Sequence, residues 1–214
     1  IKSEKQAIST SVARVRENFS EVSEWLLKHY DLKVKVLKQH QEAAAAYAAA
    51  KASLPSVAKP LVVDIGGMST ELAWGSAYIE RKGIELGLLS LKDTYYRSFY
   101  SLMYQMLPNL ENEHQHSLVV TGLTATYIAA AAYNFHYQLP WKGHAKKVRL
   151  SQINEIIRFL RYSDDKAKRF EATGMDLFIL ESALHFVKVI LERYEMTECV
   201  ICYYGISLGY IVSK

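Results

Sequence analysis

The sequence contains little cysteine and little proline, and it has no long apolar run. No stretch is apolar for the roughly 18 residues that a membrane helix needs, so we expect no membrane partner. Ile1 opens a charged segment, IKSEKQ, which argues against a signal peptide. With two cysteines among 214 residues, nothing suggests a secreted disulfide scaffold, and we expect a cytoplasmic protein.

The two cysteines, Cys199 and Cys202, have a spacing that also occurs in redox and zinc motifs. A redox pair would sit at the start of a helix, but the surrounding segment ECVICYYG is typical of a buried strand. Residues three apart on a strand point to opposite faces, so the two sulfur atoms should not meet. We interpret both as core side chains, and no second pair exists to complete a zinc site.

The charge balance is mild, with 26 basic and 22 acidic residues and a net charge of +4. Such a surplus would help to attract a polyanion, but many proteins without such a ligand share it. It gives no reason to expect a DNA partner. Half of the residues are hydrophobic, which is enough to bury a sizeable core.

The chain divides into two parts at a linker that Pro55 and Pro60 bracket. The first part, residues 1–56, predicts a helix over 18–30 that Asp31 ends, a strand over 32–37 and an alanine-rich helix over 41–51. The second part covers residues 57–214. Its strands are expected over LVVDIGG, STELAWG, residues 78–91, SLVVTG and ECVICYYG, and its helices over residues 92–107, TATYIAAAAY, a segment with Ser151 as N-cap, residues 175–194 and ISLGYIVSK. This order predicts an α/β domain with a five-stranded mixed sheet and helices on both faces.

The most informative segment is the octet from Asp64 to Glu71, DIGGMSTE, which lies between two predicted strands. Glycines at Gly66 and Gly67 would let backbone N–H groups close on an anion with no Cβ in the way, and Ser69 adds a hydroxyl donor. The flanking carboxylates suit a hard divalent cation. A plain β-turn with incidental polar residues is the alternative.

A second candidate loop is Thr121-Gly122-Leu123-Thr124, at the end of another predicted strand. It opens the next helix, and the free N–H groups of a helix N-terminus can bind an anion. Alone this signal is weak, because many strands lead into helices in this way. Two such loops in one domain strengthen the phosphate-binding interpretation of each.

At this point a resemblance to a known family is apparent. DIGGMSTE resembles the D-I-G-G-G-S-T-E signature of the exopolyphosphatase and guanosine pentaphosphate phosphohydrolase family. STSVARVREN, KVLKQHQEA, VVTGLTATYIA and YYGISLGYI are similar to further family segments, in the same order along the chain. The resemblance implies the ribonuclease H-like fold of the superfamily of actin, sugar kinases and Hsp70 ATPases. Residues 57–214 would form the second, phosphate-binding lobe, and residues 1–56 the C-terminal part of the first.

The resemblance also implies roles for individual residues. Glu42 falls on the family's catalytic glutamate and would activate a water molecule for attack on a terminal phosphorus. Arg14 would hold a phosphate oxygen. Asp64 and Glu71 would bind Mg²⁺, directly or through water. The phosphate loops would be lined by Gly66, Gly67, Ser69, Gly122 and Thr124.

The sequence departs from the family pattern at several positions. Met68 and Leu123 each replace a glycine of a phosphate loop, and Gln39 replaces the glycine before the catalytic segment. Ser207 and Leu208 stand in place of arginine and glutamate, and Glu181 stands where glycine is usual. Nothing in the sequence resembles the first phosphate loop of the family, D-x-G-S-N-S, which would precede it.

These observations leave two functional readings and one weaker one. The first is a hydrolase that removes terminal phosphate from inorganic polyphosphate or guanosine pentaphosphate. The second is a degenerate lobe that binds a nucleotide or a partner without catalysis. The third, a kinase of the same superfamily, fits the Glu42 segment poorly. A homodimer is one possible oligomeric state. We expect the basic cluster of Lys142, Lys146, Lys147 and Arg149 in a loop, which is either solvated or in contact with a polyphosphate tail.

Overall fold

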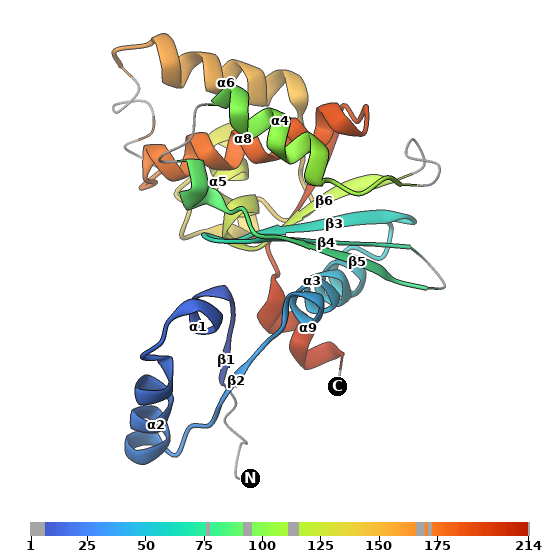
Figure 1. Ribbon diagram of the computed structural model, residues 1–214. Helices are drawn as coiled ribbons and strands as arrows, with labels where there is room; N and C mark the ends of the chain where they lie inside the picture. Colours follow the sequence, from blue (N-terminus) through green and yellow to red (C-terminus); the bar gives the residue numbers. More distant parts are fainter. Residues whose placement is uncertain are drawn as a thin grey trace.

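The computed structural model describes residues 7–75, 78–91, 96–110, 116–165, 170 and 173–213 (Figure 1). Its N-terminal part contains β1 (Ala7–Ser9), α1 (Ser11–Val15), α2 (Phe19–Tyr30) and β2 (Val34–Val36). β1 and β2 pair in parallel as a small separate sheet. Asp31 ends α2 in the left-handed conformation, with φ of 51°, so this end of the helix is confirmed.

A six-stranded mixed sheet forms the centre of the remaining chain, in the order β5-β4-β3-β6-β8-β7. Its strands are β3 (Pro60–Ile65), β4 (Thr70–Trp74), β5 (Glu80–Ile84), β6 (Ser117–Thr121), β7 (Lys147–Arg149) and β8 (Glu198–Cys202). β3, β6 and β8 are parallel, whereas β4, β5 and β7 run antiparallel to their neighbours. The carboxyl ends of the three parallel strands therefore meet at one edge.

Helices cover both faces of this sheet, as expected (Figure 1). One face carries α4 (Tyr96–Met106), α5 (Gly122–Tyr133), α6 (Leu150–Tyr162) and α8 (Leu177–Arg193), and the other carries α3 (Gln39–Ser53) and α9 (Ile206–Val212). Two short 3-10 turns lie between strands and helices: η1 (Leu88–Leu91) between β5 and α4, and η3 (Pro140–Lys142) between α5 and β7. Within the described part of the chain, no helix combines the length and the apolar character that crossing a membrane requires.

The two faces of the sheet have separate cores because side chains alternate along each strand. Leu61 and Val63 pack in the large core under α4, α5, α6 and α8, whereas Val62 packs in a smaller core with the alanines of α3. Cys199 lies in the first core and Cys202 in the second, so their sulfur atoms are on opposite faces, as predicted. The small side chains of α3 let it lie close to the sheet and to α9.

Three expectations need correction or qualification. The sheet has six strands rather than five, because Lys147 and Arg149 of the basic cluster lie in β7 instead of a loop. Lys147 Nζ lies 2.6 Å from Glu198 Oε1 on β8. The helix α6 begins at Leu150, with Arg149 rather than Ser151 as N-cap. α3, which precedes the linker, packs on the sheet of the second part; the division at residues 56 and 57 stays a prediction.

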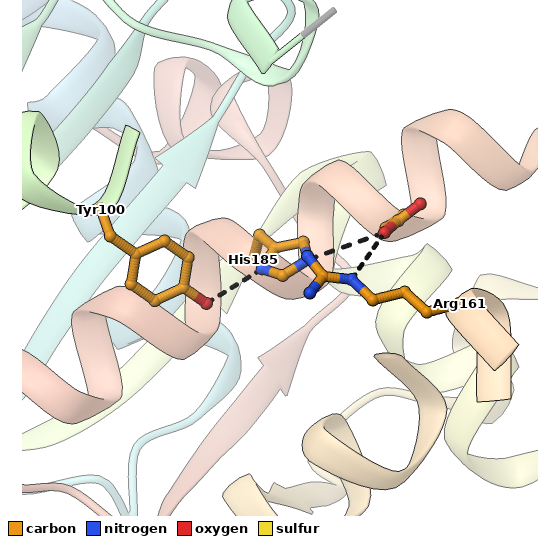
Figure 2. Close-up of polar contacts among 4 residues, drawn as sticks. Tyr100, Arg161 and His185 are labelled. Carbon is orange, nitrogen blue, oxygen red and sulfur yellow. Dashed lines mark hydrogen bonds and ion pairs between the residues drawn. The ribbon is translucent and has the colours of Figure 1, made fainter. Parts of the chain in front are cut away.

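A polar network lies within the helical layer on the face opposite α3 (Figure 2). Arg161 Nη2 lies 2.9 Å from His185 Nε2, and Tyr100 Oη lies 2.9 Å from His185 Nδ1. Because a guanidinium only donates, Nε2 accepts and the proton of this imidazole is on Nδ1. Burial lowers the pKa of His185. Glu181, which replaces a family glycine, accepts from Arg161 Nε at 3.4 Å, so the network accommodates this departure.

The contact of α9 with α3 generates a test of the packing. A Cβ added to Gly209 would lie 1.6 Å from the Ala45 carbonyl oxygen, so this crossing requires glycine. We expect Gly209→Ala to lower the free energy of unfolding by about 3 kcal/mol, because the overlap outweighs the higher helix propensity of alanine. Urea denaturation measures this loss. Ser207→Ala, at an exposed position of the same helix, should change it by less than about 0.5 kcal/mol. Equal effects of the two substitutions would contradict the close crossing.

Candidate active site

The strand register brings the predicted carboxylates together. Asp64 on β3 pairs with Glu71 on β4 on one side and with Thr121 on β6 on the other. Paired residues of neighbouring strands share a face, and Asp64 is two residues beyond Val62, whose side chain packs against α3. Asp64 and Glu71 therefore point toward the helix that carries Glu42. The alternation of the strands thus explains why residues far apart in the sequence form one cluster.

Glu42 lies in the first turn of α3 and has an ion pair with Arg14 of α1. The Glu42 side chain is 3% exposed and the Arg14 side chain 23%. Arg14 Nη1 also donates to the Leu37 carbonyl oxygen at 2.7 Å, which fixes the guanidinium against the end of β2. α1 and α3 thus bring the predicted phosphate ligand and the predicted base into direct contact.

The glycine turn after β3 is held by backbone contacts. The Gly66 N–H donates to the Ser69 carbonyl at 2.9 Å, and the Leu88 N–H donates to the Gly66 carbonyl at 2.9 Å. A Cβ on Gly87 would lie 2.4 Å from the backbone of Gly67, so the segment before η1 touches the turn directly. Because the Gly66 N–H is used within the turn, any anion contact at this loop would begin at Gly67. The sequence analysis assigned no role to Gly87.

The second loop lies beside the first. Gly122 has φ of 72°, and a Cβ there would lie 3.0 Å from Asp64 Oδ1. The Thr121 hydroxyl donates to the same oxygen at 3.0 Å. The Thr124 hydroxyl is buried and donates to the Ile65 carbonyl at 2.6 Å, so it anchors the start of α5 to β3. Thr124 therefore positions the loop, although the resemblance implied that it lines the phosphate.

An open cavity of about 690 Å³ lies in front of this cluster. Arg14 and Ser69 are in its wall, and Glu42 lies behind Arg14. Other residues in the wall include Ser11, Lys38, Gln39, His40, Met68 and Glu85. The sequence analysis gave Lys38, His40 and Glu85 no role, although Lys38 and His40 lie within KVLKQHQEA, a segment similar to the family. Leu123, which replaces a loop glycine, is 59% exposed at the start of α5.

The cluster contains more carboxyl groups than cationic side chains to balance them. Burial raises the pKa of Asp64 to about 6 and that of Glu71 to about 8. These values also include smaller effects: the nearby Glu42 carboxylate raises both, whereas hydrogen bonds from Thr121 to Asp64 and from Ser69 to Glu71 lower them. Burial also raises the pKa of Glu42, against the lowering effect of Arg14. In this cluster one guanidinium faces three carboxyl groups, which leaves a deficit of positive charge.

The residues present fit a divalent cation. The buried Glu71 Oε1 has no hydrogen-bond partner, and an oxygen in this position is suited to a cation or its water shell. Among the described residues, no group of three or more His, Cys, Asp and Glu side chains is arranged to hold a metal by itself. Mg²⁺ commonly binds through one or two carboxylates together with waters and substrate phosphates. Asp64 and Glu71 match this mode of binding.

Comparison with known proteins places these features in a family. The sequence model of the Ppx/GppA phosphatase family matches residues 3–214. No curated protein sequence matches the chain significantly. The crystal structure of the Aquifex aeolicus member of that family is similar, with a TM-score of 0.81 at 24% identity over 97% of this chain and 72% of the other.

An exopolyphosphatase from Cytophaga hutchinsonii is also similar, with a TM-score of 0.80 at 18% identity over 97% of this chain and 73% of the other. At these identities the likeness shows a shared fold. The α/β fold with a mixed sheet that the resemblance implied is therefore confirmed.

The raised pKa values predict how stability depends on pH. The folded protein keeps protons on Asp64 and Glu71 that the unfolded chain, with ordinary values of 3.8 and 4.5, has already released. The stability of the metal-free protein should therefore fall as the pH rises from about 4 through about 8. Glu71→Gln removes the carboxyl group with the larger pKa shift, and so the larger part of this loss of stability. We expect the substitution to stabilise the metal-free protein at pH 9 by about 2 kcal/mol, with little gain at pH 5.

Thermal unfolding in the presence of a chelator measures this effect. Mg²⁺ should raise the melting temperature of the wild type more at pH 8 than at pH 6, because the ligands must lose their protons. In Glu71→Gln, Mg²⁺ should raise the melting temperature much less. The matched control is Glu80→Gln, an exposed glutamate on the adjacent strand β5. If Glu71→Gln and Glu80→Gln behave alike at every pH, the charge deficit of the cluster is not real.

Proposed function

Since this chain belongs to the Ppx/GppA phosphatase family, we propose that it hydrolyses the terminal phosphoanhydride bond of inorganic polyphosphate or guanosine pentaphosphate. The single observation that carries this proposal is the meeting of Arg14 and Glu42 with the Asp64–Glu71 pair behind an open cavity. A base, a phosphate ligand and two carboxylates are the parts that such a reaction requires. We propose a cytoplasmic location for the enzyme.

Substrate binding would begin at the mouth of the cavity. Arg14 lies in the wall, in front of Glu42, so its guanidinium is the first charged group of the cluster that a terminal phosphate meets. Its planar fork binds phosphate oxygens well. The hydroxyl of Ser69 and backbone N–H groups from Gly67 onward would contact the same phosphate, and Gly122 would let the next phosphate approach without a side chain in the way.

Glu42 would then act as general base. In the structure Arg14 is paired with it, and a phosphate that draws the guanidinium toward the cavity would leave the carboxylate with a raised pKa. A base of raised pKa holds more strongly the proton that it takes from water. The water oxygen would attack the terminal phosphorus, the bond from that phosphorus to the bridging oxygen would break, and the proton would pass to Glu42.

Asp64 and Glu71 would hold Mg²⁺, directly or through water. Bound there, the cation would neutralise phosphate charge and polarise the bond that breaks. The Thr121 hydroxyl and the close approach of Gly122 fix the Asp64 carboxylate, and Ser69 fixes that of Glu71. These contacts keep both oxygen ligands on the face of the sheet that α3 covers.

The second candidate function is a degenerate lobe that binds a nucleotide or a partner and does not turn over. The specific observation in its favour is that Met68 lines the cavity with a side chain that is 37% exposed, at a position where the family has glycine. A thioether there removes space in which backbone would contact phosphate. The two candidates make opposite predictions for phosphate release.

The catalytic role of Glu42 is tested by Glu42→Gln in the full-length protein. We expect phosphate release from the better of the two substrates to fall on the order of a hundredfold or more, the usual contribution of a general base, while phosphate binding is retained. A phosphate-release assay and calorimetry measure the two quantities. Glu85→Gln, in the wall of the same cavity, is the matched control and should keep most of the activity. Release by Glu42→Gln at the wild-type rate would remove the proposed base.

The proposal of a degenerate, non-catalytic lobe is tested at Met68. If the wild type binds either substrate but releases no phosphate, Met68→Gly should restore backbone access and produce measurable release. If the wild type is active, Met68→Gly should change KM by roughly tenfold or less, because one side chain at the edge of a cavity alters contact area rather than the base. The control Leu102→Gly changes an exposed apolar residue of α4, away from the cavity, although it also weakens that helix. Loss of all activity in Met68→Gly with an intact fold would contradict both expectations.

A further inference from the structure

An aromatic cluster lies next to the second phosphate loop, and none of the roles described above uses it. Thr121 on β6 pairs with Cys202 on β8, so both strands end at the edge that carries Asp64. The chain continues from Cys202 through Tyr203 and Tyr204 to Gly205. A Cβ on Gly205 would lie 3.3 Å from the Cα of Gly122, so the end of this segment touches the phosphate loop.

The two tyrosine rings lie against each other and remain accessible. Their centroids are 4.8 Å apart with an interplanar angle of 38°, and the residues are 36% and 39% exposed. The ring of His144 packs edge-on against Tyr204 with a centroid distance of 5.2 Å. Three aromatic side chains thus gather in one place, and both tyrosines are more than a third exposed.

Hydrogen bonds hold this cluster in place. The Tyr203 N–H donates to His144 Nδ1 at 3.3 Å, so this imidazole carries its proton on Nε2. Nε2 in turn lies 3.3 Å from the Ser53 carbonyl oxygen, at the end of α3, and can donate to it. The Cys202 thiol donates to the Tyr204 carbonyl at 3.2 Å and closes a tight turn. These hydrogen bonds hold the segment from Cys202 to Tyr204 in one conformation. Little conformational entropy of the rings is therefore lost when a ligand binds.

We propose that Tyr203 and Tyr204 form the stacking surface for the purine base of a nucleoside polyphosphate, so that this active site takes guanosine pentaphosphate in preference to inorganic polyphosphate. The proposal rests on the proposed function, since the terminal phosphate must lie at Asp64 and Glu71. Neighbouring strands are about 4.8 Å apart, so Cys202 is roughly 10 Å from Asp64 across β6. The triphosphate and ribose of a nucleotide can bridge this distance.

The chemistry of the cluster favours a base over a phosphate chain. Aromatic faces bind the π-surface of a base, whereas a polyphosphate chain has only anionic oxygens, which gain nothing from a ring face. Lys146, which follows His144 by two residues, has its Nζ 4.2 Å from the ring centroid of Tyr133. Lys147 is paired with Glu198. Lys146 and Lys147 are thus engaged by other side chains and not by the ring cluster.

The experiment compares Tyr203→Ala, Tyr204→Ala and the conservative Tyr204→Phe with wild type, in the full-length protein. For each we would measure kcat and KM with guanosine pentaphosphate and with inorganic polyphosphate. The ratio of the two kcat/KM values should fall roughly tenfold to a hundredfold in the alanine variants, mainly through KM for the nucleotide. Tyr204→Phe should restore it, because the ring is kept. Tyr162→Ala, an exposed tyrosine of α6, is the control and should leave the ratio unchanged.

A binding measurement separates this inference from the proposed function. Guanosine tetraphosphate binding is measured by calorimetry in the Glu42→Gln background, where turnover is removed. Loss of that binding in Tyr204→Ala supports the stacking surface even if no variant hydrolyses either substrate, an outcome that would contradict only the proposed hydrolysis. Hydrolysis of polyphosphate by a wild type that binds no guanosine tetraphosphate overturns the stacking surface and leaves the proposed hydrolysis standing. An equal fall in kcat/KM for both substrates also overturns it, because the tyrosines would then act only through the fold.

Discussion

The structure around the cavity depends on burying three carboxyl groups beside one guanidinium. Glu42, Asp64 and Glu71 come from three different elements, and Arg14 pairs with Glu42 and lowers the pKa of Glu71 through space. Their raised pKa values record the cost of this arrangement. A chain that only had to fold would gain by replacing such a cluster with apolar side chains. The cluster is therefore best understood as a site prepared for positive charge from a ligand.

Around this cluster, the fold provides rigidity through backbone contacts. Gly87 lies against the glycine turn, Gly205 lies against Gly122, and Gly209 lies against α3. Each contact joins one of the two candidate loops or the Glu42 helix to a different segment of the chain. The loops are consequently supported by main chain, and Met68 and Ser69 of the first loop line the cavity. Such support limits the movement of groups whose positions would decide the rate of phosphoryl transfer.

Much of this arrangement could be predicted from the sequence, for reasons that particular residues make clear. The apolar strand before Asp64 and the glycines after it fixed the loop, and alternation along the strands separated Cys199 from Cys202. β7 was missed because three residues rich in basic side chains carry no apolar pattern, and only pairing with β8 makes them a strand. The commitment of the Thr124 hydroxyl to a backbone carbonyl was also beyond prediction, because it depends on how α5 approaches β3.

The contact between Gly87 and the turn at Gly67 constrains how this part of the sequence can diverge among relatives. At position 87 any side chain would overlap the main chain of the turn. A substitution there would therefore require the turn to change its conformation. At position 68, one residue further along the turn, the side chain points into open space and the backbone tolerates methionine. Two positions at the same turn are thus constrained differently: position 87 is restricted by the main chain against which it packs, and the side chain at position 68 is restricted by what enters the cavity.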